Sequence, residues 1–246
     1  IFVVSCKLMP YKILACDDIH PKGLSILQGI GEVDERKKLS EEELVQIIGD
    51  YHALLVRSQT KVTARVIEAA TEMKIIARAG VGIDNVDVPA ATKRGILVVN
   101  SPQGNTIAAA EHTLAMMLAL SRHLTTADRS LKMGEWRRND FVGTELYQKC
   151  LGILGLGKIG SHIAKVTNTL GMKVLAYDPY VTEEQARKLG VKMGTIEEVL
   201  ETADYVTLHL PLLPETTNII DHQALEKMKM GVRIINCARG GLIDEQ

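Results

Sequence analysis

The chain has few cysteines, few aromatic residues and no long apolar run. Only 4 of its 246 residues are cysteines, namely Cys6, Cys16, Cys150 and Cys237, and they form no Cys-x-x-Cys pair. This usage is typical of a reduced, intracellular protein and not of a disulfide-rich scaffold. No apolar stretch reaches the roughly 20 residues that a membrane-spanning helix needs. We therefore expect a cytoplasmic protein with no membrane partner.

An excess of charge of either sign is also absent. The 29 basic and 30 acidic residues leave a formal net charge of −1, so there is no electrostatic reason to expect nucleic acid as a partner. Metal ligands at a typical spacing are missing as well, and we expect no metal site. With 46% hydrophobic residues, however, the chain can bury the core of one or two globular domains.

The first eight residues are apolar but are not typical of a signal peptide. They lack a positively charged start and a small-residue cleavage site. We interpret them as non-native or peripheral, because Met9 and Pro10 would be a natural start just before the first expected strand.

Strand and helix patterns alternate through the first hundred residues. We expect strands at residues 12–16, 53–56, 74–78 and 96–99, and helices at residues 21–28, 40–48, 63–70 and 88–93. Ser40 and Glu43 form a capping box at the start of the second helix. Such alternation predicts a parallel sheet covered by helices. We assign residues 9–103 to a flavodoxin-like α/β domain.

A loop at residues 100–105 separates this domain from a second α/β domain, at residues 104–246. A long helical pattern follows the loop, and residues 125–148 then show no clear period, which is typical of an interface or functional segment. Five further strands are expected, at residues 151–154, 173–177, 191–193, 205–209 and 232–236. A doubly wound dinucleotide-binding (Rossmann) sheet has six strands, so we expect this one to lack its last strand.

The most informative motif is a glycine-rich turn between an expected strand and an expected helix: Gly155, Leu156, Gly157, Lys158, Ile159 and Gly160. The first glycine permits the tight turn, the second lets the backbone approach a pyrophosphate, and the third lets helix and strand pack closely. Asp178 ends the next strand, where its carboxylate can bind ribose hydroxyls and repel a 2′-phosphate. The motif therefore predicts NAD as the cofactor, and not NADP.

Two other residues follow expected strands, where ligands bind in such sheets. Arg239 is flanked by small residues and has a guanidinium that suits a carboxylate. The residues alone leave open that Arg239 is a solvated loop arginine, and that His209 only ends its strand.

Four segments together resemble the D-isomer-specific 2-hydroxyacid dehydrogenase family. They are RAGVGIDNVD at residues 78–87, GLGKIG at 155–160, LPLLPETT at 210–217 and NCARGG at 236–241. The resemblance runs from about residue 9 to residue 246. Within the family the chain is most similar to the members that act on 3-phosphoglycerate.

The resemblance implies roles for individual residues. Arg239 matches the catalytic arginine, which binds the substrate carboxylate, polarises the 2-oxo group and borders the cofactor. Gly80 and Val81 match the loop whose N–H groups hold the same carboxylate. Asp178 matches the ribose acid, and the other positions that match the NAD site are Thr106, Gly155, Gly157, Lys158, Ile159, Gly160, His209, Pro211, Cys237 and Ala238.

Three arginines favour a phosphorylated substrate. Arg57 and Arg78 would face the active cleft, and Arg138 resembles a basic residue that reaches the substrate phosphate from a neighbouring subunit. Arginine is suited to a dianionic phosphate, although charged loop residues are often only solvated. The family also implies a homo-oligomer, a dimer or larger, through residues 125–148.

The proton donor of the reaction is missing. In the family a histidine and its partner glutamate lie well downstream of the arginine that Arg239 matches, whereas only seven residues follow Arg239 here. We therefore expect a C-terminally truncated enzyme with little activity of its own.

The resemblance implies an NAD-dependent oxidoreductase that interconverts 3-phosphoglycerate and 3-phosphohydroxypyruvate, the first step of serine biosynthesis. A glyoxylate or hydroxypyruvate reductase of the same family is one alternative. A non-catalytic, NAD-sensing interaction protein on the same fold is another, because a fold does not by itself define a function.

Overall fold

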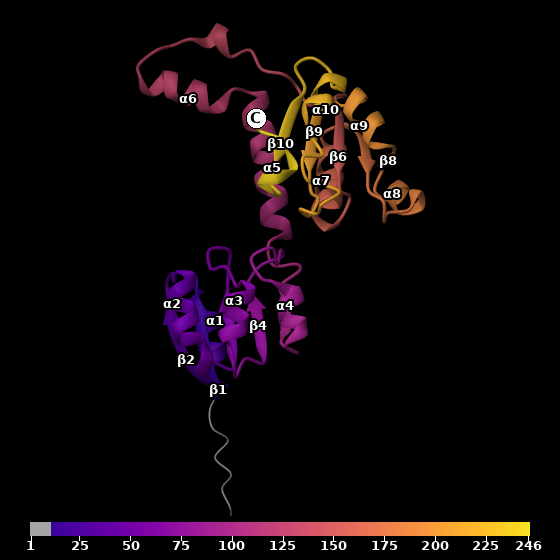
Figure 1. Cartoon of the computed structure of the whole chain (residues 1–246). Helices are drawn as coiled ribbons and strands as arrows, with labels where there is room; N and C mark the ends of the chain where they lie inside the picture. The colour runs from indigo at the N-terminus through magenta and orange to yellow at the C-terminus, as the bar shows by residue number, and fades with distance from the viewer. Residues whose placement is uncertain (1–10) are drawn as a thin grey trace, which may run out of the picture. The chain divides into compact units, whose positions relative to one another are not determined.

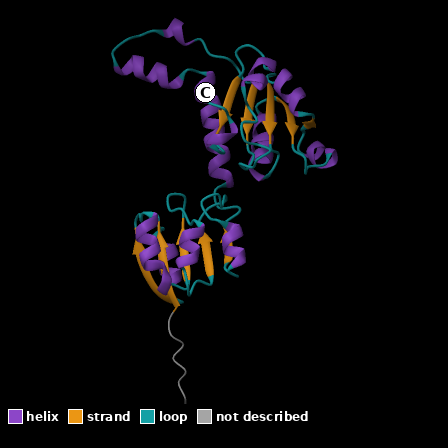
Figure 2. Cartoon of the chain, in the orientation of Figure 1, coloured by secondary structure: helices purple, strands orange, loops and turns teal. Residues whose placement is uncertain are grey.

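The computed structural model describes residues 11–246, which divide into two compact units, one ending at Asn105 and one running from Thr106 to Gln246. Each unit is a parallel β-sheet with helices packed beside it (Figures 1 and 2). The interpretations of residues 1–8, of Cys6 and of Met9 lie outside the described residues.

The first unit contains five parallel strands in the order β2-β1-β3-β4-β5. This is the flavodoxin-like order of doubly wound sheets. The strands are β1 (Tyr11–Cys16), β2 (Gly31–Arg36), β3 (Ala53–Val56), β4 (Ile75–Arg78) and β5 (Leu97–Asn100); the helices are α1 (Pro21–Gln28), α2 (Glu41–Ile47), the short 3₁₀ helix η1 (Ile48–Asp50), α3 (Ala64–Ala69) and α4 (Val88–Lys93).

Strand β2 was not expected from the sequence. Its six residues, GEVDER, include three acids and no run of apolar residues. It nevertheless pairs with β1 along its whole length, from Tyr11 beside Gly31 to Cys16 beside Arg36. Because β2 lies at the edge of the sheet and is mostly half-buried or exposed, backbone pairing holds it without an apolar pattern.

The second unit also contains five parallel strands, in the order β10-β9-β6-β7-β8. Counted within this unit the order is 3-2-1-4-5, which is that of the doubly wound dinucleotide-binding fold. The strands are β6 (Cys150–Leu154), β7 (Lys173–Tyr177), β8 (Lys192–Met193), β9 (Tyr205–Leu208) and β10 (Arg233–Asn236); the helices are α5 (Thr106–Ser121), α6 (Leu124–Lys132), α7 (Lys158–Thr169), α8 (Glu183–Lys188), α9 (Ile196–Thr202) and α10 (His222–Lys227), with 3₁₀ turns η2 (Arg138–Phe141) and η3 (Gly240–Leu242). The predicted fold class, two doubly wound α/β sheets, is confirmed.

The segment for which the sequence shows no clear period contains α6 and η2. In Figure 1 this segment extends away from the sheet of its own unit. Only Ser130 of α6 is buried, so few contacts within the chain hold this helix in place. No helix among residues 11–246 is long and apolar enough to cross a membrane.

Apolar side chains fill the interior of both units. Leu14, Leu54 and Ile76 are buried in the first sheet, and Leu151 and Ile153 in the second. The second core also contains one polar link, because the buried hydroxyls of Ser121 and Tyr205 lie 2.8 Å apart. This hydrogen bond joins the last residue of α5 to the first residue of β9.

Candidate cofactor and substrate site

The cofactor residues expected in the second unit follow the carboxyl ends of its strands. Gly155 follows β6, Asp178 follows β7, and His209 follows β9; Cys237, Ala238 and Arg239 follow β10. Since all five strands are parallel, these ends share one edge of the sheet, which is where ligands bind in open α/β folds.

The three glycines of the fingerprint have different surroundings. Gly155 has φ +97°, and a Cβ there would lie 2.7 Å from the carbonyl oxygen of His209. A Cβ on Gly160 would overlap the carbonyl oxygen of Gly155, so α7 and β6 approach too closely for any side chain. At Gly157 a Cβ would meet nothing within 4 Å. The side of the turn at Gly157 therefore has open space for a ligand.

Helix α7 begins at this open space. Its N-cap is Gly157, which supplies no side-chain cap, and Lys158 and Ile159 form its first turn. The first N–H groups of a helix have no partner within the helix and attract anions, as the helix dipole does. The helix start and the open turn thus fit the pyrophosphate of a dinucleotide.

Asp178 is held at the end of β7 by two backbone groups. Its Oδ2 accepts the N–H of Leu156 at 2.8 Å, and its Oδ1 accepts the N–H of Tyr180 at 2.9 Å. Each oxygen keeps a lone pair for a further donor. The half-buried carboxylate can therefore accept ribose hydroxyls, and its charge disfavours a phosphate at the same place.

Arg239 lies in a turn that Asn236 organises. The Asn236 amide donates to the carbonyl of Arg239 at 2.7 Å and accepts the N–H of Ala238 at 3.0 Å. The guanidinium is half-buried, and its Nη1 donates to the Ala238 carbonyl at 2.8 Å. Asn236 was not among the site residues expected from the sequence; its place at the end of a strand, in a residue type that favours turns, is the signal that could have found it.

His209 is half-buried and lies within hydrogen-bonding distance of two groups. Its N–H donates to the carbonyl of Leu154 at 2.8 Å, and its Nε2 lies 3.0 Å from the hydroxyl of Thr207. Burial lowers the pKa of His209 to about 4. The imidazole is therefore neutral near pH 7.

Pro211 and Thr106 occupy the margins of this edge. Pro211 is exposed in the loop after β9, where its carbonyl accepts the hydroxyl of Thr216 at 2.6 Å. Thr106 is the first residue of α5. Arg138 lies in η2, on the segment that extends away from the sheet (Figure 1), so the structure does not bring it to the strand ends of its own unit.

The expected substrate residues of the first unit lie at the carboxyl ends of β3 and β4. Arg57 is exposed directly after β3, and Arg78 ends β4 and donates from Nε to the Arg57 carbonyl at 3.3 Å. The N–H of Gly80 already donates to the Arg78 carbonyl at 2.9 Å, whereas the N–H of Val81 makes no hydrogen bond among residues 11–246. Val81 is therefore the better anion donor of the two.

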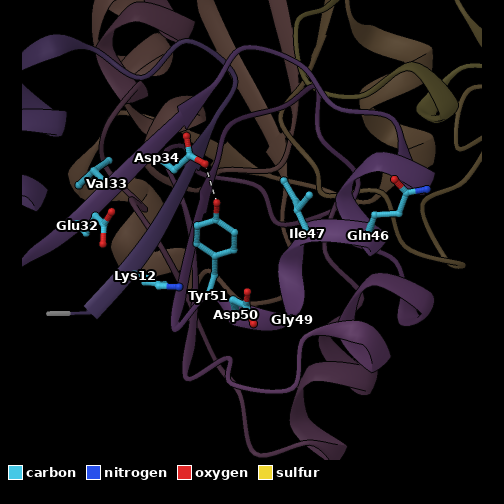
Figure 3. Close-up of a pocket in the computed structure, with 9 residues that line it drawn as sticks. All are labelled: Lys12, Glu32, Val33, Asp34, Gln46, Ile47, Gly49, Asp50 and Tyr51. Atoms are coloured by element: carbon cyan, nitrogen blue, oxygen red, sulfur yellow. Dashed lines mark hydrogen bonds between the residues drawn. The ribbon is translucent and has the colours of Figure 1, made fainter. Parts of the chain in front are cut away.

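A cavity of about 520 Å³ lies elsewhere in the first unit (Figure 3). At its centre the hydroxyl of Tyr51 donates to Asp34 at 2.6 Å, and burial, with this carboxylate, raises the pKa of Tyr51 to about 12. The lining contains none of the expected site residues and consists of Lys12, Glu32, Val33, Asp34, Gln46, Ile47, Gly49, Asp50 and Tyr51. Within the described residues no cluster of three or more His, Cys, Asp or Glu could hold a metal ion.

Comparison with known proteins connects this geometry to one family. Residues 114–246 match the family described as "D-isomer specific 2-hydroxyacid dehydrogenase, NAD binding domain". The protein named D-3-phosphoglycerate dehydrogenase of Synechocystis sp. is 53% identical over 235 residues, and that of Methanocaldococcus jannaschii is 48% identical over 236 residues. Each match covers 96% of this chain.

Solved structures agree with the family match. A D-lactate dehydrogenase of Aquifex aeolicus, crystallised with NAD and lactic acid, is 28% identical with a TM-score of 0.84, over 94% of this chain and 70% of that one. The chain spans less than half the length of the two curated relatives, 42% and 45%.

Replacing Asp178 tests the basis of cofactor choice. In Asp178→Asn one carboxylate acceptor becomes an amide donor and the negative charge is lost. We expect the Kd for NADH to rise by about 10-fold or more, because one hydrogen bond to a charged group is lost. The preference for NADH over NADPH should become smaller. Calorimetric titration with both cofactors measures this, with the exposed Glu183→Gln as control; an unchanged preference would contradict the assignment.

The neutral state of His209 has a consequence for stability. Its pKa of about 4 lies below the ordinary 6.5, so the unfolded chain takes up a proton between these values and the folded chain does not. The free energy of unfolding should fall as pH drops from about 6.5 to 4, by up to about 1.4 kcal/mol per pH unit from this residue. Urea unfolding of His209→Gln at several pH values should show a smaller fall, while the exposed His222→Gln should behave like the parent; the same fall in both variants would refute the assignment.

Proposed function

Because the chain belongs to the D-isomer-specific 2-hydroxyacid dehydrogenase family, we propose that the protein interconverts 3-phosphoglycerate and 3-phosphohydroxypyruvate with NAD. The observation that carries this proposal is the 53% identity, over 96% of the chain, to a protein named D-3-phosphoglycerate dehydrogenase. The proposal is also supported by an arginine at the carboxyl ends of the strands in each sheet, Arg57 in the first unit and Arg239 in the second. This reaction would be the first step of serine biosynthesis.

The domain at residues 104–246, which contains the second unit, would hold the cofactor. NAD accepts or supplies the hydride when it is bound. The helix start at Gly157 and Lys158 would bind the pyrophosphate, and Asp178 the adenosine ribose. The remaining residues that would line the cofactor are Thr106, Gly155, Ile159, Gly160, His209, Pro211, Cys237, Ala238 and Arg239.

Arg239 would bind the carboxylate of the substrate and polarise its 2-oxo group. A guanidinium can form two parallel hydrogen bonds to a carboxylate, and donors fixed in advance stabilise the charge that develops on the carbonyl oxygen. Asn236 supports this role because it holds the backbone of the Arg239 turn on both sides. In the first unit the N–H groups of Val81 and Gly80 would bind an anionic group of the substrate.

The domain at residues 9–103, which makes up nearly all of the first unit, would bind the substrate. Arg57 is exposed, and its guanidinium makes none of the hydrogen bonds or ion pairs found among residues 11–246, so it is available to a phosphate. Arg78 would add positive charge beside it. Arg138 would reach the phosphate of a substrate bound to a neighbouring subunit. Its place in residues 125–148, the segment that extends away from the sheet, is in keeping with this role.

A second copy of the chain would cover that segment and α5. Helix α5 is apolar around its circumference and leaves Ile107, Met116, Leu118 and Leu120 exposed. Trp136 and Met133, on the extended segment, are 78% and 70% exposed. A helix that is apolar all round is normally buried, and exposed apolar patches mark interfaces. We therefore propose a homodimer or larger homo-oligomer.

Arg57→Ala tests the choice of substrate. We expect kcat/KM for 3-phosphohydroxypyruvate to fall by about 10- to 100-fold, the loss of a charged hydrogen bond, with little change for hydroxypyruvate. The rates are measured with NADH on the native-length protein, and Lys61→Ala, which removes an exposed charge nearby, serves as control. A parent protein that prefers unphosphorylated hydroxypyruvate would instead identify a hydroxypyruvate reductase.

A further inference from the structure

Asp17 is a buried carboxylate to which the sequence analysis assigns no role. It directly follows β1, is 2% exposed, and has φ +69°. In the register of the sheet Ala15 lies beside Leu55, so the residues that follow, Asp17 and Arg57, come together at the carboxyl ends of β1 and β3. A charge is rarely buried in this way unless donors satisfy it.

All the donors come from one segment, residues 57–60. The Asp17 Oδ2 accepts the backbone N–H groups of Arg57 at 2.8 Å, Gln59 at 3.2 Å and Thr60 at 3.0 Å. The Asp17 Oδ1 accepts the hydroxyl of Thr60 at 2.6 Å. The carboxylate thus receives four hydrogen bonds from three residues of this segment, two of them from Thr60, and no cation takes part in them.

The carbonyl side of the same segment is held as well. The Asn85 amide donates to the carbonyls of Arg57 at 2.9 Å and Thr60 at 2.7 Å, and Arg78 donates to the Arg57 carbonyl. The backbone of Arg57 is therefore fixed on both sides while its side chain is exposed. A side chain with a fixed backbone loses less conformational entropy when it binds a ligand.

We propose that Asp17 is the positioning residue for substrate binding in the first unit: its carboxylate holds residues 57–60 in the conformation that presents Arg57 to the anionic group of the substrate. The proposal rests on the proposed function for the role of Arg57. That Asp17 holds the segment rests on the hydrogen bonds alone.

Asp17→Asn is the direct test, and Asp18→Asn is its matched control. Asparagine tolerates positive φ as aspartate does, so the substitution removes the charge and half of the acceptor capacity with little change of shape. Asp18 has φ +51° but is exposed. Should Asp17→Asn fail to fold, Thr60→Val removes only the hydroxyl donor and takes its place.

Trypsin reports on the segment without any need for activity, because it cleaves after Arg57 only when the backbone there opens. We expect the product that ends at Arg57 to form about 10-fold faster in Asp17→Asn, or several-fold faster in Thr60→Val, and at the parent rate in Asp18→Asn. Mass spectrometry identifies the product, and thermal unfolding verifies that the variant is folded. An unchanged rate in a folded variant overturns the proposal.

Kinetics on the native-length protein tests the substrate part. Asp17→Asn should raise KM for 3-phosphohydroxypyruvate by about 10-fold, leave KM for NADH unchanged, and add nothing further to Arg57→Ala, because both act through one guanidinium. Equal rises in the KM values for both substrates, or effects of Asp17→Asn and Arg57→Ala that add in full, would show that Asp17 has a merely structural role. Either result would overturn the substrate part of the proposal. If Arg57→Ala itself has no effect on KM, the proposed function of Arg57 fails and the substrate part fails with it, whereas the trypsin result still decides whether Asp17 holds the segment.

Discussion

Parallel strand pairing brings the ends of distant segments to one edge of each sheet. In the second unit this edge gathers residues from the ends of β6, β7, β9 and β10, and the last residues of β6 and β10, Leu154 and Asn236, are 82 positions apart in the chain. The same constraint in the first unit puts the loops after β1, β3 and β4 beside one another. The chemistry therefore depends on loops, and the sheets determine which loops meet.

Within each edge, polar side chains that are buried (Asp17) or half-buried (Asn85 and Asn236) hold the backbone of the loop that carries an arginine. Asn236 holds the turn of Arg239, and Asp17 and Asn85 hold the segment of Arg57. None of these three residues need touch a substrate. Their hydrogen bonds fix main-chain groups, so that each arginine side chain extends from an ordered backbone. Pre-organisation of this kind lowers the entropic cost of binding an anion.

Much of the fold followed from local sequence patterns, and the remaining parts did not for physical reasons. The fingerprint could be found because the positive φ of Gly155 and the close contact of Gly160 with the Gly155 carbonyl both lie within one turn. Strand β2 was missed because its stability comes from backbone pairing with β1 and not from an apolar pattern. Asp17 could not be found either, because its donor Thr60 lies 43 residues away and only the register of β1 and β3 brings the two together.

The central claim is that the edge formed by Gly157, Asp178 and the start of α7 binds NAD in preference to NADP. Calorimetric titration of the native-length protein with NADH and with NADPH tests it most directly. The carboxylate of Asp178 predicts that NADH binds at least about 10-fold more tightly than NADPH, since a phosphate beside it would meet an uncompensated charge. Equal affinities, tighter binding of NADPH, or no binding of either would contradict the account.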